Sequence, residues 1–239
     1  MSSRKIKKKV LALLARSNLS DTLAQILEMP THDIIHSLFS AISRNEEIIR
    51  WHAITCMGIT VARLAAEDME KARIVMRRLL WSLNDESGGI GWGAPESLAE
   101  IMTRHEGLAR EYVHMLTSYM RKDGEEMWQE GNFLEHEVLQ RGLLWGIGRL
   151  AGKRRALLQQ QDITTNLLAY MPANDAAVRG LAARSLGLMK ADIAASPLQS
   201  LVTDTATLRL YEDECLKTVS VGELARQALD RLNAGEQRP

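Results

Sequence analysis

Eight side chains with the chemistry of a binding site fall in three short segments of the sequence. Arg50, Trp51 and His52 are consecutive, and Trp92 precedes Glu96 by four residues. In the third segment Trp145 follows Arg141 by four positions. Tryptophan and arginine carry much of the binding energy at protein interfaces, while histidine and glutamate add hydrogen bonds and charge. The predicted ligand- or partner-binding residues are Arg50, Trp51, His52, Trp92, Glu96, His136, Arg141 and Trp145.

The same side chains also fit a purely structural role. Each tryptophan can wedge between helix layers with its N–H satisfied, and each arginine can pair with an acid of a neighbouring repeat. Sequence alone leaves both interpretations open, because it does not tell whether the tryptophans face a groove or the core.

Histidine pairs raise the question of a metal site. His32 and His36 would share one helical face, but the pair lacks the intervening glutamate of the zinc-protease motif. His52 with Glu135 and His136 is a second cluster that could bind a metal or perform acid–base chemistry. Histidines at such positions also satisfy buried carbonyl groups. We therefore predict neither a metal nor a cofactor.

A glycine-rich run over residues 88–93 leads into a helix that begins near Pro95. The run lacks the Gly-Lys-Ser/Thr of a phosphate-binding loop, and it follows a helix rather than a strand. We expect these glycines to adopt positive φ angles and to approach a neighbouring element closely, which would carry Trp92 to a defined place. An anion-binding loop at the helix start is the alternative, although Glu96 works against an anion there.

No catalytic residue can be assigned. Ser97 lacks the context of a nucleophile elbow, and Cys56 lies in an apolar helical stretch that is typical of a small core residue. Cys56 and Cys215 are far apart in sequence, which favours reduced thiols in a cytoplasmic protein.

Composition narrows the class of partner. The chain has 239 residues, and its 30 basic side chains balance 30 acidic ones, which disfavours nucleic acid as a partner. The basic groups are nonetheless dense over residues 4–16, and a further run covers 153–155. No apolar stretch approaches the roughly 18 residues needed to span a bilayer, so we expect no membrane association.

Helices must position these side chains, because apolar residues recur three and four places apart through almost the whole chain. One segment departs from this period: residues 208–219 alternate around an acidic turn at 212–214 and predict a small β-hairpin. The sequence Ser220-Val221-Gly222-Glu223 has the spacing of a capping box and predicts a helix start.

Four segments share one pattern, anchored at Arg50, Glu96, Arg141 and Arg179, and a weaker fifth is anchored at Gly222. A spacing near 40 residues predicts a solenoid of about five helix pairs, an α-α superhelix of HEAT/ARM type. Successive second helices would line a concave face and bring the three anchored tryptophans near one surface. We predict a single solenoid over 1–239, with amino-terminal capping helices at 1–30 and repeat units at 31–66, 67–121, 122–151, 155–190 and 196–233.

Residues 175–187, Asp-Ala-Ala-Val-Arg-Gly-Leu-Ala-Ala-Arg-Ser-Leu-Gly, resemble the HEAT-like repeat typified by the phycobilisome-lyase repeat. In that repeat an acidic residue opens the second helix, and Val-Arg precedes the Ala and Leu-Gly positions. Residues 87–96, 132–137 and 141–146 are similar to segments of an uncharacterised bacterial family of HEAT-like proteins. The resemblance implies a fold and no reaction.

Three functions remain open at this level. The first is a non-enzymatic interaction or scaffold module that binds a protein segment on its concave face. The second is a helical-repeat enzyme, either DNA glycosylase-like or lyase-like, and the third is a small-molecule or metal binder that uses the same groove. We expect a protein or peptide partner and no enzymatic activity, and nothing in the sequence sets the oligomeric state.

Overall fold

The structure is a computed structural model that describes residues 3–84, 91–124 and 131–236. Within these residues the chain forms twelve α-helices, one short 3-10 helix and a single two-stranded sheet. The predicted all-α fold with a small β-hairpin is confirmed. The chain divides into two compact units, Met1–Tyr112 and Val113–Pro239, which are described separately below.

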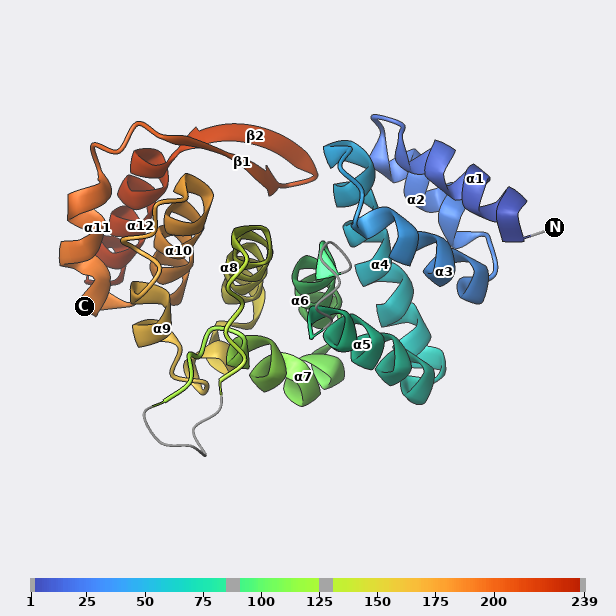
Figure 1. The fold of residues 1–239 in the computed structure, drawn as a ribbon, viewed down its shortest axis with the longest axis horizontal. Coiled ribbons are helices and arrows are strands. Elements are labelled where there is room, and N and C mark those ends of the chain that lie inside the picture. Colours follow the sequence, from blue (N-terminus) through green and yellow to red (C-terminus); the bar gives the residue numbers. More distant parts are fainter. Residues whose placement is uncertain (1–2, 85–90, 125–130, 237–239) are drawn as a thin grey trace. The chain divides into compact units, whose positions relative to one another are not determined.

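Unit 1 contains six complete helices and most of a seventh (Figure 1). Asn18 and Asp68 each cap a helix, because their side chains accept a hydrogen bond from the backbone N–H three residues later, at 3.1 Å in both cases. The helices are α1 (Ser3–Leu14), α2 (Leu19–Leu27), α3 (Thr31–Ile42), α4 (Glu47–Glu67), α5 (Met69–Leu83), α6 (Ala94–Arg104) and α7 (Glu106–Ser118), the last of which crosses the unit boundary.

The centre of unit 1 is the pair α4 and α6. Both helices are buried on nearly every side, including all residues from Ala94 to Met102. Gly58 lies directly against Glu100, and a Cβ at position 58 would come within 2.5 Å of that side chain. Ala53 and Ala99, the small residues three places after the repeat anchors, are fully buried. Small residues therefore let the two helices approach closely.

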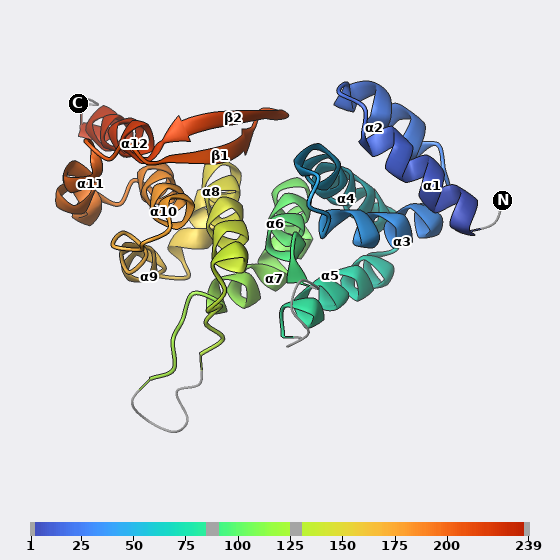
Figure 2. The same ribbon diagram turned by 45° about the horizontal axis from the view of Figure 1, so that its top comes forward.

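Unit 2 contains the remaining helices and the sheet, with the hairpin running across α8 and α10 (Figures 1 and 2). Its elements are α8 (Glu137–Gln159), α9 (Thr164–Leu168), α10 (Ala176–Met189), a 3-10 turn (Asp192–Ala194), α11 (Ala195–Leu201), β1 (Thr207–Glu212), β2 (Cys215–Ser220) and α12 (Val221–Glu236).

Helices α8, α10 and α12 pack in sequence, and glycines lie at their crossings. Gly148 of α8 faces Ser185 of α10, and Gly187 of α10 lies against the backbone of Ala228 in α12. A Cβ at position 187 would stand 2.5 Å from Ala228, so a larger residue would force the two helices apart. This arrangement repeats in unit 2 the close helix contact seen at Gly58.

The hairpin pairs β1 with β2 antiparallel, in the register Thr207↔Ser220 to Glu212↔Cys215. Its two-residue turn is Asp213-Glu214, and both residues have positive φ, 49° and 60°. Positive φ at both positions is the geometry of a type I′ turn, which matches the twist of the strands. The sequence prediction of a hairpin at 208–219 is thus confirmed to within a residue at each end.

The capping box at the start of α12 is also confirmed. The Ser220 N–H donates to Glu223 Oε2 at 2.7 Å, and the Glu223 N–H donates to Ser220 Oγ at 3.1 Å. These reciprocal bonds satisfy two backbone donors that a helix start would otherwise leave without partners. The sheet therefore passes into α12 without an intervening loop.

Helix boundaries and the predicted repeat units coincide only in part. The unit at 31–66 covers α3 and nearly all of α4, and the one at 155–190 holds α9 and α10. The unit at 67–121 contains three helices rather than two, and the one at 122–151 ends inside α8. The division of the chain into repeats stays a prediction.

Candidate functional site

The first group of predicted site residues lies at the start of α4 in unit 1. Arg50 is half-buried, and its guanidinium carbon stands 5.8 Å from the centre of the Trp51 ring, within cation–π range. Trp51 itself is only 7% exposed. His52 is buried, and its Nδ1 lies 2.9 Å from the backbone carbonyl of Leu14, the last residue of α1. His52 therefore satisfies a carbonyl at a helix end, and the structure gives it an anchoring role.

Trp92 is positioned by the turn that precedes α6. Gly93 has φ = 78°, and a Cβ at this position would clash with the carbonyl oxygen of Ile42 at the end of α3. Only glycine tolerates both the left-handed backbone and this close approach. The predicted positive φ and close approach to a neighbouring element are confirmed at Gly93, whereas residues 88–90 lie outside the described residues. That the run fixes the place of Trp92 stays a prediction.

Glu96 sits in the first turn of α6 and is 8% exposed. Burial raises the pKa of its carboxyl, and neither a backbone hydrogen bond nor the positive charge of Arg50 offsets that effect. The electrostatic interaction with Arg50 joins the amino-terminal turn of α4 to that of α6. Arg50 and Glu96 do not form a close ion pair in the described part of the chain.

Three of these side chains keep a buried polar atom without a hydrogen-bond partner among the described residues. The atoms are Nε of Arg50, Nε1 of Trp92 and Oε2 of Glu96. Buried polar groups in native proteins are nearly always paired, so three such atoms in predicted site residues of one unit call for an explanation. We refer to Arg50, Trp92 and Glu96 as the Arg50 cluster.

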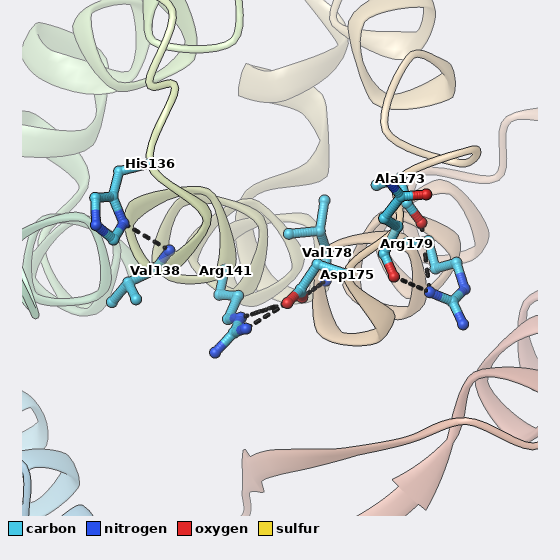
Figure 3. A network of polar contacts seen from close by, with 8 residues as sticks. His136, Val138, Arg141, Ala173, Asp175, Val178 and Arg179 are labelled. Carbon is cyan, nitrogen blue, oxygen red and sulfur yellow. Dashed lines mark hydrogen bonds and ion pairs between the residues drawn. The ribbon is translucent and has the colours of Figure 1, made fainter.

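The second group of predicted site residues lies in unit 2, where polar contacts join the starts of α8 and α10 (Figure 3). His136 is the N-cap of α8, and its Nδ1 accepts from the Val138 N–H at 3.3 Å. Arg141 Nε donates to both carboxylate oxygens of Asp175, at 3.1 and 3.2 Å. Asp175 also caps α10 by accepting from the Val178 N–H at 2.9 Å. Both predicted residues thus take part in contacts that organise helix starts.

Trp145 is 6% exposed, and its Nε1 donates to the backbone carbonyl of Tyr211 in β1 at 2.8 Å. This bond ties α8 to the hairpin. Sequence reasoning left open whether Trp51 and Trp145 face a groove or the core, and the structure places both in the core of their own units.

Arg50, Trp51, His52, Trp92 and Glu96 all belong to unit 1, whereas His136, Arg141 and Trp145 belong to unit 2. Within unit 1, Arg50 stands over the Trp51 ring and its charge acts on Glu96. Sequence reasoning missed Glu100, which is 2% exposed and pairs with Arg104 of its own helix at 2.6 Å. The i, i+4 spacing of glutamate and arginine was the available signal.

The other histidine pair lies in a cleft of about 560 Å³ between α3 and α5 of unit 1. The rings of His32 and His36 are 4.7 Å apart in an edge-to-face arrangement. Arg78, on the facing helix, stands 4.0 Å from the centre of the Phe39 ring. Among the described residues, no cluster of three or more His, Cys, Asp or Glu side chains could hold a metal ion.

None of the helices in the described part of the chain combines the length and the apolar character needed to cross a membrane.

Searches of protein-family models and of curated proteins gave no match. Solved structures did match over nearly the whole chain. An engineered protein from the Northeast Structural Genomics Consortium is 15% identical, with a TM-score of 0.55 over 98% of each chain. A designed armadillo repeat protein is 13% identical, with a TM-score of 0.50 over 94% of this chain and 99% of that chain. Another, solved in complex with the peptide (KR)4, is 14% identical, with a TM-score of 0.51 over 94% and 98%.

The fold is that of a helical repeat protein. At these identities the likeness shows the fold alone, an all-α superhelix of the armadillo-like type. Function therefore has to be argued from the residues of this chain.

Proposed function

We propose that this chain is a non-enzymatic interaction module that binds a segment of a partner protein. Unit 1 contributes the Arg50 cluster, and His136, Arg141 and Trp145 are predicted binding residues of unit 2. The observation that carries the proposal is the set of unpartnered polar atoms on Arg50, Trp92 and Glu96.

The chemistry of the Arg50 cluster favours a peptide. Arg50 Nε and Trp92 Nε1 are donors that need an acceptor, while Glu96 Oε2 is an acceptor that needs a donor while it is ionised. A peptide group, or the side-chain amide of Asn or Gln, offers a C=O and an N–H side by side. A phosphate would satisfy the two donors but would be repelled by the carboxylate.

The partner must gain access to atoms that the protein covers. Arg50 and Trp92 are only half-buried, so their side chains can move without opening the core. We infer that binding exchanges the weak contact of Arg50 with the Trp51 ring for hydrogen bonds to the incoming segment.

One of the proteins with a similar fold was solved with a bound peptide, which supports the proposal. We also propose that the repeat that contains α10 is of the phycobilisome-lyase HEAT type and that the protein acts in the cytoplasm. Asp175, which opens α10 as its N-cap, supports the first of these assignments.

The test begins with selection of peptides from a random display library on the full-length protein. Fluorescence anisotropy then measures the dissociation constant of each selected peptide for the wild type, Trp92→Phe, Glu96→Gln and the control Trp81→Phe. Trp81 is 64% exposed on α5 and is not a member of the Arg50 cluster. We expect at least a tenfold loss of affinity for Trp92→Phe and Glu96→Gln and none for the control. Failure to enrich any peptide, or equal affinities for all four proteins, would refute the proposal.

A further inference from the structure

A cavity of about 440 Å³ in unit 2 is lined by basic side chains from three helices. Lys153 and Arg155 come from α8, Lys190 follows the last turn of α10, and Arg231 comes from α12. The remaining lining residues are glycine, alanine and leucine, and no Asp or Glu is among them. We call this cavity the basic pocket.

The cations of the basic pocket differ from three arginines elsewhere in unit 2. Arg141, Arg179 and Arg184 each pair with a carboxylate, those of Asp175, Asp204 and Glu212 respectively. By contrast, Lys153, Arg155 and Lys190 are exposed and form no ion pair with any described residue.

Arg231 lies deeper than the other three cations. Its Nη1 is buried and has no hydrogen-bond partner among the described residues. Of the groups that affect the pKa of Glu212, Arg231 has the smallest effect. The basic pocket therefore contains positive charge that its own surroundings do not neutralise.

Two backbone irregularities lie beside or at three of these cations. Helix α8 is interrupted at Arg154, where φ is −133° and ψ is 33°, and this kink redirects the chain between Lys153 and Arg155. Lys190 ends α10 in the left-handed conformation, with φ = 56°, a position where glycine or asparagine is usual. A lysine held in this conformation carries a strain that glycine would not, and such strain is often retained for function.

Unsatisfied carbonyl groups give the C-terminal end of a helix a partial negative charge that repels anions. At the end of α10 this repulsion is weakened. The Lys190 N–H donates to the carbonyl of Gly187, and the Ala191 N–H donates to that of Leu186, each at 3.2 Å. These bonds satisfy two of the final carbonyls of the helix. Attraction between a cation and the helix dipole accounts for Lys190 and for Lys153, which precedes the interruption of α8, but not for Arg155 or Arg231.

The basic pocket has a rigid floor and an open rim. The close contact of Gly187 with Ala228 fixes α10 against α12 at its base. At the rim, a Cβ on Gly152 would meet nothing within 4 Å. A ligand can therefore enter without any helix moving.

We propose that the basic pocket binds a small ligand that carries a diphosphate group. Two lysines and two arginines match the multiple negative charge of a diphosphate, and guanidinium groups bind phosphate oxygens in a bidentate manner. The volume lies within the range of small-molecule sites, about 300–1,000 Å³. A nucleic acid would need an extended basic surface, whereas residues 113–239 carry slightly more acidic than basic side chains.

The test uses inorganic pyrophosphate as the probe, titrated into the full-length protein by calorimetry at low ionic strength. We expect one binding site per chain. The double variant Lys153→Ala/Arg155→Ala should bind at least tenfold more weakly, because both side chains are exposed and unpaired and their loss should not disturb the fold. Lys217→Ala on the exposed face of β2 is the matched control for the loss of a surface cation and should bind as the wild type does.

A second variant tests the position of the ligand without changing charge. Gly152→Leu fills the open rim, and leucine is a better helix former than glycine, so this protein should fold and yet bind pyrophosphate at least tenfold more weakly. The proposal is wrong if pyrophosphate does not bind, if both variants bind it as the wild type does, or if duplex DNA or vesicles of anionic lipid bind this surface while pyrophosphate does not.

Discussion

Asp175 binds Arg141 and caps α10 with the same carboxylate (Figure 3). Burial alone would raise the pKa of Asp175, but hydrogen bonds from Arg141 and from the Val178 N–H outweigh it and hold the pKa below its ordinary value. One side chain thus joins α8 to α10 and also starts the second of these helices.

A lowered pKa in the folded state means that Asp175 stabilises the protein above about pH 4, where the carboxyl of the unfolded chain is also ionised. This contribution disappears as the pH falls through the pKa of the folded protein. Asp175→Asn keeps a capping oxygen and removes the charge, so we expect a loss of about 1 kcal/mol in the free energy of unfolding at pH 7. The loss should shrink at pH 2.5, as measured by urea titration. An equal loss at both pH values would contradict the assignment.

Trp145 provides a second stability test. Trp145→Phe removes the buried indole N–H that donates to the Tyr211 carbonyl. We expect a loss of about 2 kcal/mol in the free energy of unfolding. Trp81→Phe is the control, since Trp81 is 64% exposed and its replacement should change stability by less than about 0.5 kcal/mol. Comparable losses in the two variants would show that the hydrogen bond contributes nothing.

Glu96 should lower stability at neutral pH, because its pKa is raised in the folded state. The carboxyl of the unfolded chain ionises near pH 4.3, so above that pH ionisation favours the unfolded chain until the folded carboxyl ionises as well. Glu96→Gln should therefore be more stable than the wild type at pH 8, and the gain should vanish near pH 4. Chemical denaturation across this range measures the effect. A variant that is less stable at pH 8 would show that Arg50 already compensates the charge in full.

The two cysteines should differ sharply in reactivity. Burial raises the pKa of the Cys56 thiol to about 12, whereas Cys215 is exposed in β2. Because the thiolate is the reactive form, a thiol-specific reagent should modify one equivalent in the native protein and a second only after unfolding. Cys215→Ser should leave the native protein without rapid reaction, and a fast reaction in that variant would place Cys56 at the surface.

Local patterns with an explicit backbone mechanism were predictable from sequence. The turn at Asp213-Glu214 and the capping box of Ser220 and Glu223 are each decided by a few neighbouring residues. Gly93 was predictable in the same way, because a glycine just before a helix start that contains proline indicates a backbone turn with positive φ. The helices themselves were predictable for the same reason, because the three- and four-residue recurrence of apolar side chains is also a local pattern.

Long-range pairing was not predictable in this way. Nothing near Trp145 in the sequence indicates that its N–H reaches Tyr211, 66 residues later. The basic pocket shows the same limit, because the run at 153–155 was visible while Lys190 and Arg231 join it only through helix packing. The sequence pattern identified which residue types were unusual, and the tertiary structure decided which of them have partners.

The hairpin gives unit 2 a connection that a simple row of repeats lacks. In a repeat array each helix pair contacts only its neighbours, so segments can unfold one after another from an end. Here β1 is hydrogen-bonded to Trp145 of α8 and ion-paired with Arg184 of α10 through Glu212. It also pairs with β2, which leads directly into α12. Loss of α12 would therefore also weaken the contact between β1 and α8, although α10 packs between α8 and α12. Unit 2 should melt in one transition rather than fray from its carboxyl end.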